Sequence, residues 1–136
     1  MSGNSWVMLI PNNIFSRIKN EFSASMKTKY GMKDSNFTDE ATDTPSKFPL
    51  VYVHMLSPSE VGQTLDGKSI NGGLFTFQIE VYDNAKKSTA LDVMSEVLRI
   101  MKKMRFEVVG MPEHFKTDTH RYVMRCRRVI GATDSI

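Results

Sequence analysis

The sequence has little cysteine and no long apolar run. These two shortages exclude disulfide-rich proteins and proteins with membrane-spanning helices. One Cys in 136 residues excludes a disulfide framework within the chain, and three scattered His leave little material for a zinc site. No segment reaches the roughly 20 apolar residues that a membrane helix needs. The N-terminus lacks the basic region and apolar core of a secretory signal. We therefore expect a protein made in the cytosol, without a membrane anchor.

An excess of charge of one sign is also lacking, because 18 Lys+Arg face 15 Asp+Glu for a net charge of +3. That excess is too small to indicate nucleic-acid binding by itself. The length suits one ordinary domain, and the 40% hydrophobic and 24% charged residues are typical of a globular chain. We expect a single domain over residues 1–136.

Two segments show the apolar spacing of an amphipathic helix. Ile14, Ile18 and Phe22 recur every four residues, which predicts a helix over residues 11–30 that ends at Gly31. A second helix is expected over residues 91–104, preceded by a capping box of Thr89 and Asp92 or by a Ser88 cap. Its apolar stripe consists of Leu91, Met94, Val97, Leu98, Met101 and Met104.

Strands are predicted where apolar residues alternate or β-branched residues cluster. The expected strands cover residues 48–56, 74–82, 106–109 and 120–130, with the third stopped by Gly110 and Pro112. In the last strand the alternation places Tyr122, Met124 and Cys126 on the inward face. The polar residues 33–47 are expected to form a mobile loop, and residues 57–73 the excursion of a long hairpin.

The predicted order is helix, strand, strand, helix, strand, strand. Neither helix can bury its apolar stripe alone, and a sheet with one apolar face also needs a cover. Packing both helices on one face of a mainly antiparallel sheet satisfies both needs. The sequence therefore predicts an α+β fold, a two-layer sandwich.

Residues 62–69 (GQTLDGKS) match the P-loop pattern G-x-x-x-x-G-K-[ST]. A P-loop binds phosphate at the start of a helix that begins at its Lys. Here Asn71, Gly72 and Gly73 follow at once and lead into a predicted strand. We therefore interpret the string as a Gly-containing hairpin tip.

The residue types that catalyse reactions or bind metals, such as His, Cys, Asp and Glu, do not occur at the spacings typical of known sites. His54, His114, His120 and Cys126 lack the close spacings of a metal site. Cys126 lies on the inward face of its predicted strand, where a thiol is a packing residue. Without a nucleophile elbow or a distinctive carboxylate pair, we expect no enzyme activity, no cofactor and no metal.

Charge is unevenly distributed along the chain. Residues 33–66 carry two Lys against six Asp+Glu, a net charge of −4, and residues 101–128 carry eight Lys+Arg against three Glu+Asp, a net charge of +5. A row of arginines on a strand has three interpretations. The arginines line a nucleic-acid groove, pair with carboxylates of a neighbouring chain, or keep one face of the sheet solvated. Acidic and basic regions in one chain favour head-to-tail assembly, in which unlike patches meet.

The candidate interface residues come from these two regions. Phe37, a lone aromatic in the polar segment, either anchors a partner or contacts its own domain. The candidates are Arg121, Arg125, Arg127, Arg128, Phe37, Asp39, Glu40 and Asp43.

The second half of the chain carries a recognisable succession of segments. Residues 74–82 (LFTFQIEVY), the helix 91–104, residues 105–112 (RFEVVGMP) and residues 120–128 (HRYVMRCRR) follow one another. This arrangement resembles the tail terminator, or tail completion, proteins of long-tailed bacteriophages. In that family a strand and turn lead into a helix, a short strand ending in Gly, a loop, and a strand with Arg and Tyr. The helix predicted over residues 11–30 fits the same plan.

The resemblance implies a structural virion protein rather than an enzyme. Family members assemble in the bacterial host cytoplasm as hexameric rings on the head-proximal end of the tail tube, stop its polymerisation and provide the surface that docks the head. The implied partners are further copies of the chain, the tail tube protein and a head–tail connector, with DNA passing through the lumen without specific binding. We assign Arg125 and Arg127 to subunit contacts.

Two other functions remain open at this point. Another head–tail connector or neck adaptor would share the virion setting and contact the portal side. A small nucleic-acid-binding module would use the same arginines on phosphates.

Overall fold

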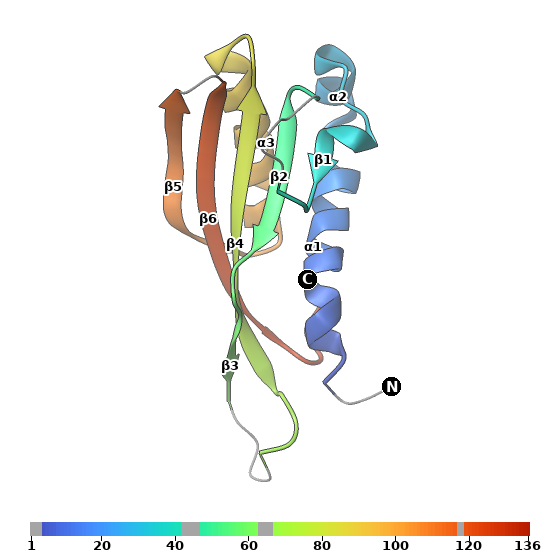
Figure 1. Cartoon of the computed structure of the whole chain (residues 1–136). Helices are drawn as coiled ribbons and strands as arrows, with labels where there is room; N and C mark the ends of the chain where they lie inside the picture. The colour runs from blue at the N-terminus through green and yellow to red at the C-terminus, as the bar shows by residue number, and fades with distance from the viewer. Residues whose placement is uncertain (1–3, 42–46, 63–66, 117–118) are drawn as a thin grey trace.

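A computed structural model describes residues 4–41, 47–62, 67–116 and 119–136 (Figure 1). The helices are α1 (Trp6–Glu21), α2 (Ala24–Tyr30) and α3 (Lys87–Lys103), with a 3-10 turn at Asp34–Asn36. The strands are β1 (Phe37–Thr38), β2 (Leu50–Met55), β3 (Ser59–Val61), β4 (Gly72–Asp83), β5 (Glu107–Lys116) and β6 (His120–Gly131).

The strands form one sheet in the order β1-β2-β4-β6-β5, with β3 paired to the start of β4. β1 runs parallel to β2, and the other pairings of the described strands are antiparallel. Helices α1 and α3 pack on one face, and the face turned toward the viewer in Figure 1 has no helix over it. The predicted α+β fold with a mainly antiparallel sheet is confirmed, although α2, β1 and β3 interrupt the predicted order.

The core lies between this sheet and the helices. It consists largely of the residues that the strand alternation and the helical spacing predict to point inward. Along β4, Phe75, Phe77, Ile79 and Val81 are each no more than 1% exposed. The apolar side chains of α1, α3 and β6 join them in one buried cluster. The alternation of the two long strands therefore predicts the inner face correctly. The stripe predicted for the second helix is correct for Met94, Val97 and Met101 and wrong for Leu91, which is 43% exposed.

The N-terminal helix begins earlier than predicted and is broken in the middle. α1 begins at Trp6, whose Nε1 donates to the carbonyl of Ile70 at 3.3 Å. Pro11 lies inside α1 and cannot donate to the carbonyl of Val7. The break falls at Ser23, whose backbone N–H donates to Glu96 Oε2 at 2.8 Å. The single helix predicted over residues 11–30 is therefore wrong, because contacts from distant segments fix both its start and its break.

The start of α3 is also set by a residue outside the predicted capping box. α3 begins at Lys87, so Ser88 and Thr89 lie within the helix rather than before it. Asp83, at the end of β4, accepts the backbone N–H groups of Ala85 at 3.1 Å and Lys86 at 2.7 Å. The carboxylate thereby satisfies donors ahead of the helix, as a capping side chain does.

β5 is much longer than the strand predicted over residues 106–109. It continues through Gly110 and Pro112, and its register against β6 shifts on each side of Gly110. Such bulges absorb extra residues without ending a strand. Pro112 is tolerated because β5 is an edge strand, where a missing N–H breaks no interior pairing. The predicted stop is therefore wrong.

The segment predicted as a mobile loop over residues 33–47 is ordered over residues 34–38. Asn36 Nδ2 donates to the carbonyl of Pro49 at 2.9 Å, and both residues are buried. Phe37 begins β1, is 5% exposed and packs edge-on against Phe22, with ring centroids 5.4 Å apart. The loop prediction is therefore wrong for these residues.

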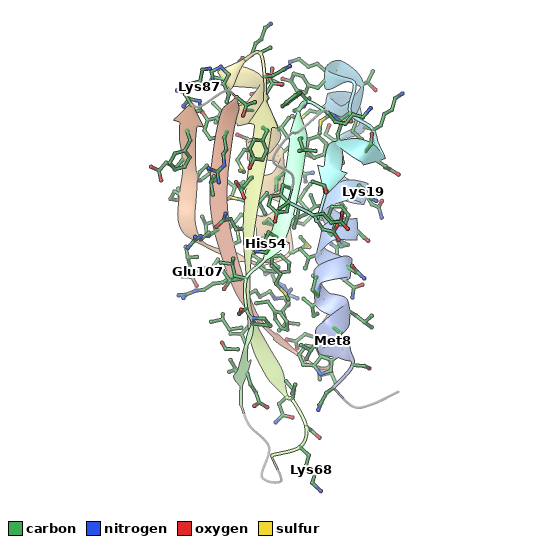
Figure 2. The ribbon with its side chains drawn as sticks, viewed as in Figure 1. Met8, Lys19, His54, Lys68, Lys87 and Glu107 are labelled. Atoms are coloured by element: carbon green, nitrogen blue, oxygen red, sulfur yellow. The ribbon has the colours of Figure 1, made fainter. Side chains whose placement is uncertain are left out.

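The hairpin predicted over residues 57–73 is confirmed where the structure describes it. Ser59–Val61 pair with the start of β4, and the arm extends past the two layers (Figure 1). Asn4 fixes the arm to the start of α1, because its Nδ2 donates to the carbonyl of Lys68 at 2.9 Å and its Oδ1 accepts from the backbone N–H of Ile70 at 2.8 Å. Lys68 is labelled on the arm in Figure 2.

Candidate interface on the open face of the sheet

The sheet face without helices is the candidate interface, and it is defined by strand register. Arg121, Arg125 and Arg127 of β6 lie on it, as the alternation predicts. They are in register with Tyr82, Gln78 and Thr76 of β4. We call this surface the open face, and its outer strands are β1 on one edge and β5 on the other (Figure 1).

Arg121 belongs to a network centred on a buried carboxylate. Its Nε donates to Glu80 Oε1 at 2.6 Å, and Glu80 is 5% exposed. The hydroxyl of Tyr82 donates to the same oxygen at 2.9 Å. Burial raises the pKa of Tyr82 to about 12, and the hydrogen bond to Glu80 acts in the same direction. Tyr82 therefore stays protonated and donates throughout the neutral range.

The guanidinium of Arg121 also lies over aromatic rings. Its Cζ is 5.9 Å from the ring centroid of Tyr82 and 5.6 Å from that of Phe115 on β5. Such cation–π contacts favour a fixed guanidinium. With Glu80 neutralising its charge, Arg121 joins β4, β5 and β6 within the chain and is not free to bind a phosphate.

Arg127 and Arg125 differ in how their charges are balanced. Arg127 Nε contacts Glu107 Oε2 at 3.2 Å in an exposed pair at the β5 edge, where Glu107 is labelled in Figure 2. Arg125 Nε donates to the neutral Oε1 of Gln78 at 3.0 Å. Within the described residues, Arg125 has no carboxylate at salt-bridge distance. Arg125 therefore presents the uncompensated positive charge of this row.

A groove of about 340 Å³ lies beside Arg125 at the β5 edge. Its most exposed apolar walls are Met111 at 73%, Val109 at 44% and Phe115 at 39%. Gly110 is in register with Arg125, and a Cβ there would lie 3.4 Å from the Cβ of Arg125. The missing side chain therefore leaves the arginine accessible from the edge. Sequence reasoning missed this groove because it ended the strand at Gly110.

Arg128 does not belong to the open face. It is in register with the buried Phe75, on the side of the sheet that the helices cover. Its guanidinium donates to the carbonyl of Met104 at 2.9 Å and to that of Ser135 at 3.0 Å. Arg128 thus connects the end of α3 to the C-terminal residues. We therefore remove it from the candidate interface. The alternation signals this position, because Arg128 follows the even-numbered inward residues of β6.

The acidic candidates lie at the opposite edge of the sheet. Asp39 and Glu40 follow β1 and are exposed. The hydroxyl of Thr38 accepts from the backbone N–H of Glu40 at 3.1 Å and donates to its carbonyl at 3.2 Å, which fixes the turn. Asp43 lies outside the described residues. Phe37 is buried in the core and contacts Phe22 of its own domain. We therefore assign it no role in partner binding.

The histidines and the cysteine do not form a metal cluster in the described part of the chain. Those residues contain no cluster of three or more His, Cys, Asp or Glu side chains suited to a metal ion. His114 Nε2 and His120 Nδ1 are 3.1 Å apart and stacked, and His114 also packs on Tyr122. Burial and nearby positive charge lower the pKa of His114. Burial raises the pKa of Cys126 to about 12, so its thiol is a poor nucleophile.

The P-loop string does not have the structure that phosphate binding requires. Residues 63–66 of the string lie outside the described residues. Its other residues belong to the arm, and the chain continues into β4 at Gly72 instead of a helix. The hairpin interpretation therefore holds for the described part of the string.

The sequence was compared with protein-family models and with curated proteins. No protein-family model matches the sequence, and no curated protein matches it either. Among the described residues, none of the helices is long and apolar enough to cross a membrane.

Proposed function

We propose that this chain is a structural virion protein that forms a ring on the head-proximal end of a phage tail tube. The ring ends polymerisation of the tube and provides the surface on which the head docks. The supporting observation is the order β4, α3, β5 and β6 in one layered fold, which matches the family plan in element order. β5 departs from that plan, because it continues through Gly110 where the family has a short strand and a loop.

The open face supports a role in assembly rather than in catalysis. It carries a partly buried ion pair, an exposed ion pair and a groove lined by both apolar and charged side chains, spread over three strands. Protein interfaces combine apolar contacts with a polar rim in this way. In the proposed ring each copy uses the two edges of its sheet on two different neighbours. We therefore propose no enzyme activity and no cofactor.

The charges of the arginines favour this function over nucleic-acid binding. Arg121 and Arg127 are compensated by Glu80 and Glu107, and Arg128 binds backbone carbonyls on the other face. A phosphate-binding groove needs several cations that are free to release counterions. One accessible Arg125 is a weak anchor for DNA, and we assign it to a contact between subunits. The neck adaptor alternative differs in the partner that the ring contacts.

The proposed function is tested by adding the purified protein to polymerising tail tube protein from the same phage. Electron micrographs should show tubes that stop growing, with added density at one end. Unchanged tube lengths and bare ends would contradict the proposal, and density on portal complexes alone would favour a neck adaptor. Gel shifts at increasing salt test the nucleic-acid alternative, because phosphate contacts lose affinity steeply with salt.

A further inference from the structure

Both edges of the sheet carry exposed charged side chains that make no ion pair within the described residues. At the β1 edge, Asp39 and Glu40 are exposed and make no ion pair within the described residues. At the β5 edge, Arg125 is exposed and bonds only the neutral Gln78, while the exposed Glu113 lines another part of the same groove. Figure 1 shows β1 and β5 at opposite sides of the sheet. One copy therefore cannot bring these charges together, but two copies side by side can.

The turn that carries the acids is held in a fixed shape. Both hydrogen bonds of the Thr38 hydroxyl are to Glu40, and β1 is tied to β2 at Val51 and Tyr52. Asp39 lies close enough to Tyr52 that its charge helps to raise the pKa of that phenol, after the larger effects of burial and of the charge of Glu80. A preorganised pair of acids beside an aromatic ring loses little entropy when it docks.

The receiving edge has a groove in which exposed apolar side chains lie beside Arg125 and Glu113. Val109, Met111 and Phe115 are all more than a third exposed, which is unusual for three large apolar residues on one short strand. Arg125 lies over Gly110, where no side chain screens it from the edge. Exposed apolar side chains beside the positive charge of Arg125 are suited to an aromatic residue flanked by carboxylates.

The backbone of β5 disfavours the simplest alternative, in which a foreign strand extends the sheet. Pro112 offers no N–H, and the register shifts around Gly110 disrupt the ladder that a new strand must follow. A docking partner therefore contacts β5 through side chains.

We propose that the β1 edge of a second copy of this chain occupies the β5 groove, with its Asp39 and Glu40 against Arg125 and its Tyr52 against the apolar wall. The contact is heterologous, because different surfaces of the two copies meet, and its repetition closes a ring or extends a filament. This inference rests on the proposed function and deepens it by naming the subunit contact.

Charge reversal tests the contact, with particle mass measured at equal protein concentrations. Arg125→Glu alone and Asp39→Lys with Glu40→Lys should each weaken self-association at least about tenfold. The variant with all three changes restores opposite charges and should recover association to within about threefold of wild type. Lys68→Glu, an exposed charge reversal on the arm (Figure 2), is the matched control and should associate normally.

Failure of rescue, or normal association of Arg125→Glu, overturns the proposed contact. If wild-type rings form on tubes while rescue fails, the contact is wrong and the proposed function stands. If Arg125→Glu abolishes tube capping but not self-association, the groove binds the tail tube protein and the inference is wrong. A wild type that stays monomeric at all concentrations, with and without tubes, overturns both.

Disulfide trapping gives a second and independent test. A chain with Glu40→Cys mixed with a chain with Met111→Cys should form a cross-linked dimer on mild oxidation, because the proposed contact brings these positions together. The native Cys126 is buried and stays silent. Leu91→Cys, exposed on α3, replaces Met111→Cys in the control mixture. Equal cross-linking in both mixtures, or none in the first, overturns the proposal.

Discussion

Arg121 and Glu80 join the two central strands of the open face through a hydrogen bond of 2.6 Å between Nε and Oε1. The carboxylate is nearly buried, while a third of the arginine side chain stays exposed. Tyr82 and Gln78 donate to the same carboxylate at 2.9 and 3.2 Å. This group of side chains stabilises the fold itself, which separates Arg121 from the arginines that are available for assembly.

Replacing Arg121 with Ala should destabilise the fold strongly. The change leaves a buried carboxylate without its cation, and we expect a loss of about 2–3 kcal/mol, below the 3–5 typical of fully buried pairs because Arg121 is partly exposed. Urea denaturation measures the difference. The matched change Arg127→Ala removes an exposed pair and should leave the unfolding midpoint almost unchanged. Equal effects of the two variants would contradict the assigned burial.

Replacing Phe37 with Ala should unfold the β1 edge of the core. The side chain is buried against Phe22, and removal of a buried Phe costs about 3–5 kcal/mol. Thermal unfolding of the dilute protein measures the loss. Phe115→Ala, at a ring that is 39% exposed, is the control and should cost under about 1 kcal/mol. A stable Phe37→Ala protein that fails only in assembly would restore the partner role rejected here.

Acid should weaken the link between α3 and the start of α2 through Glu96. Hydrogen bonds from Arg99 hold the pKa of Glu96 below its ordinary value of 4.5, outweighing burial, and the N–H of Ser23 acts in the same direction. A lowered pKa contributes stability above pH 4.5, and this contribution is lost as the pH falls through the folded-state pKa.

Glu96→Gln should therefore lower stability at pH 7 and flatten the dependence of unfolding free energy on pH below about 4.5. Urea titrations from pH 7 to pH 3 measure both effects. Glu60→Gln, at an exposed residue of β3, is the control. An identical acid slope in Glu96→Gln and wild type would show that this carboxylate is not responsible.

Cys126 should be inert to thiol reagents in the folded protein. Burial raises its pKa to about 12, so the thiolate is scarce and also shielded at pH 8. Titration with a disulfide reagent should give no reaction until denaturant is added, and then one thiol per chain. Rapid reaction of the native protein would contradict the burial and would also compromise the cross-linking test.

The parts of the fold that follow from local periodicity could be predicted from the sequence. Alternation identifies Phe75, Phe77 and Ile79 as inward residues of β4, and it does the same for Tyr122 and Met124 of β6. These patterns hold because one face of each strand is buried along its whole length. The open face and its alternating arginines could be predicted for the same reason.

The parts that depend on distant contacts could not be predicted. The break at Ser23 is held by Glu96, which lies 73 residues further along the chain. The start of α3 is a local exception, because Asp83 accepts the N–H groups ahead of the helix while Ser88 and Thr89 offer competing caps in the sequence. The bulges around Gly110 depend on pairing with β6, so Gly and Pro look like a stop when read locally. The groove beside Arg125 exists only because of those bulges.

The most direct test of the central claim is negative-stain imaging of the purified protein, alone and mixed with tail tubes. The account predicts rings, six-fold as the resemblance implies, that cap one end of each tube. Images of dispersed particles of a single 15.5 kDa chain, with uncapped tubes in the mixture, would contradict it.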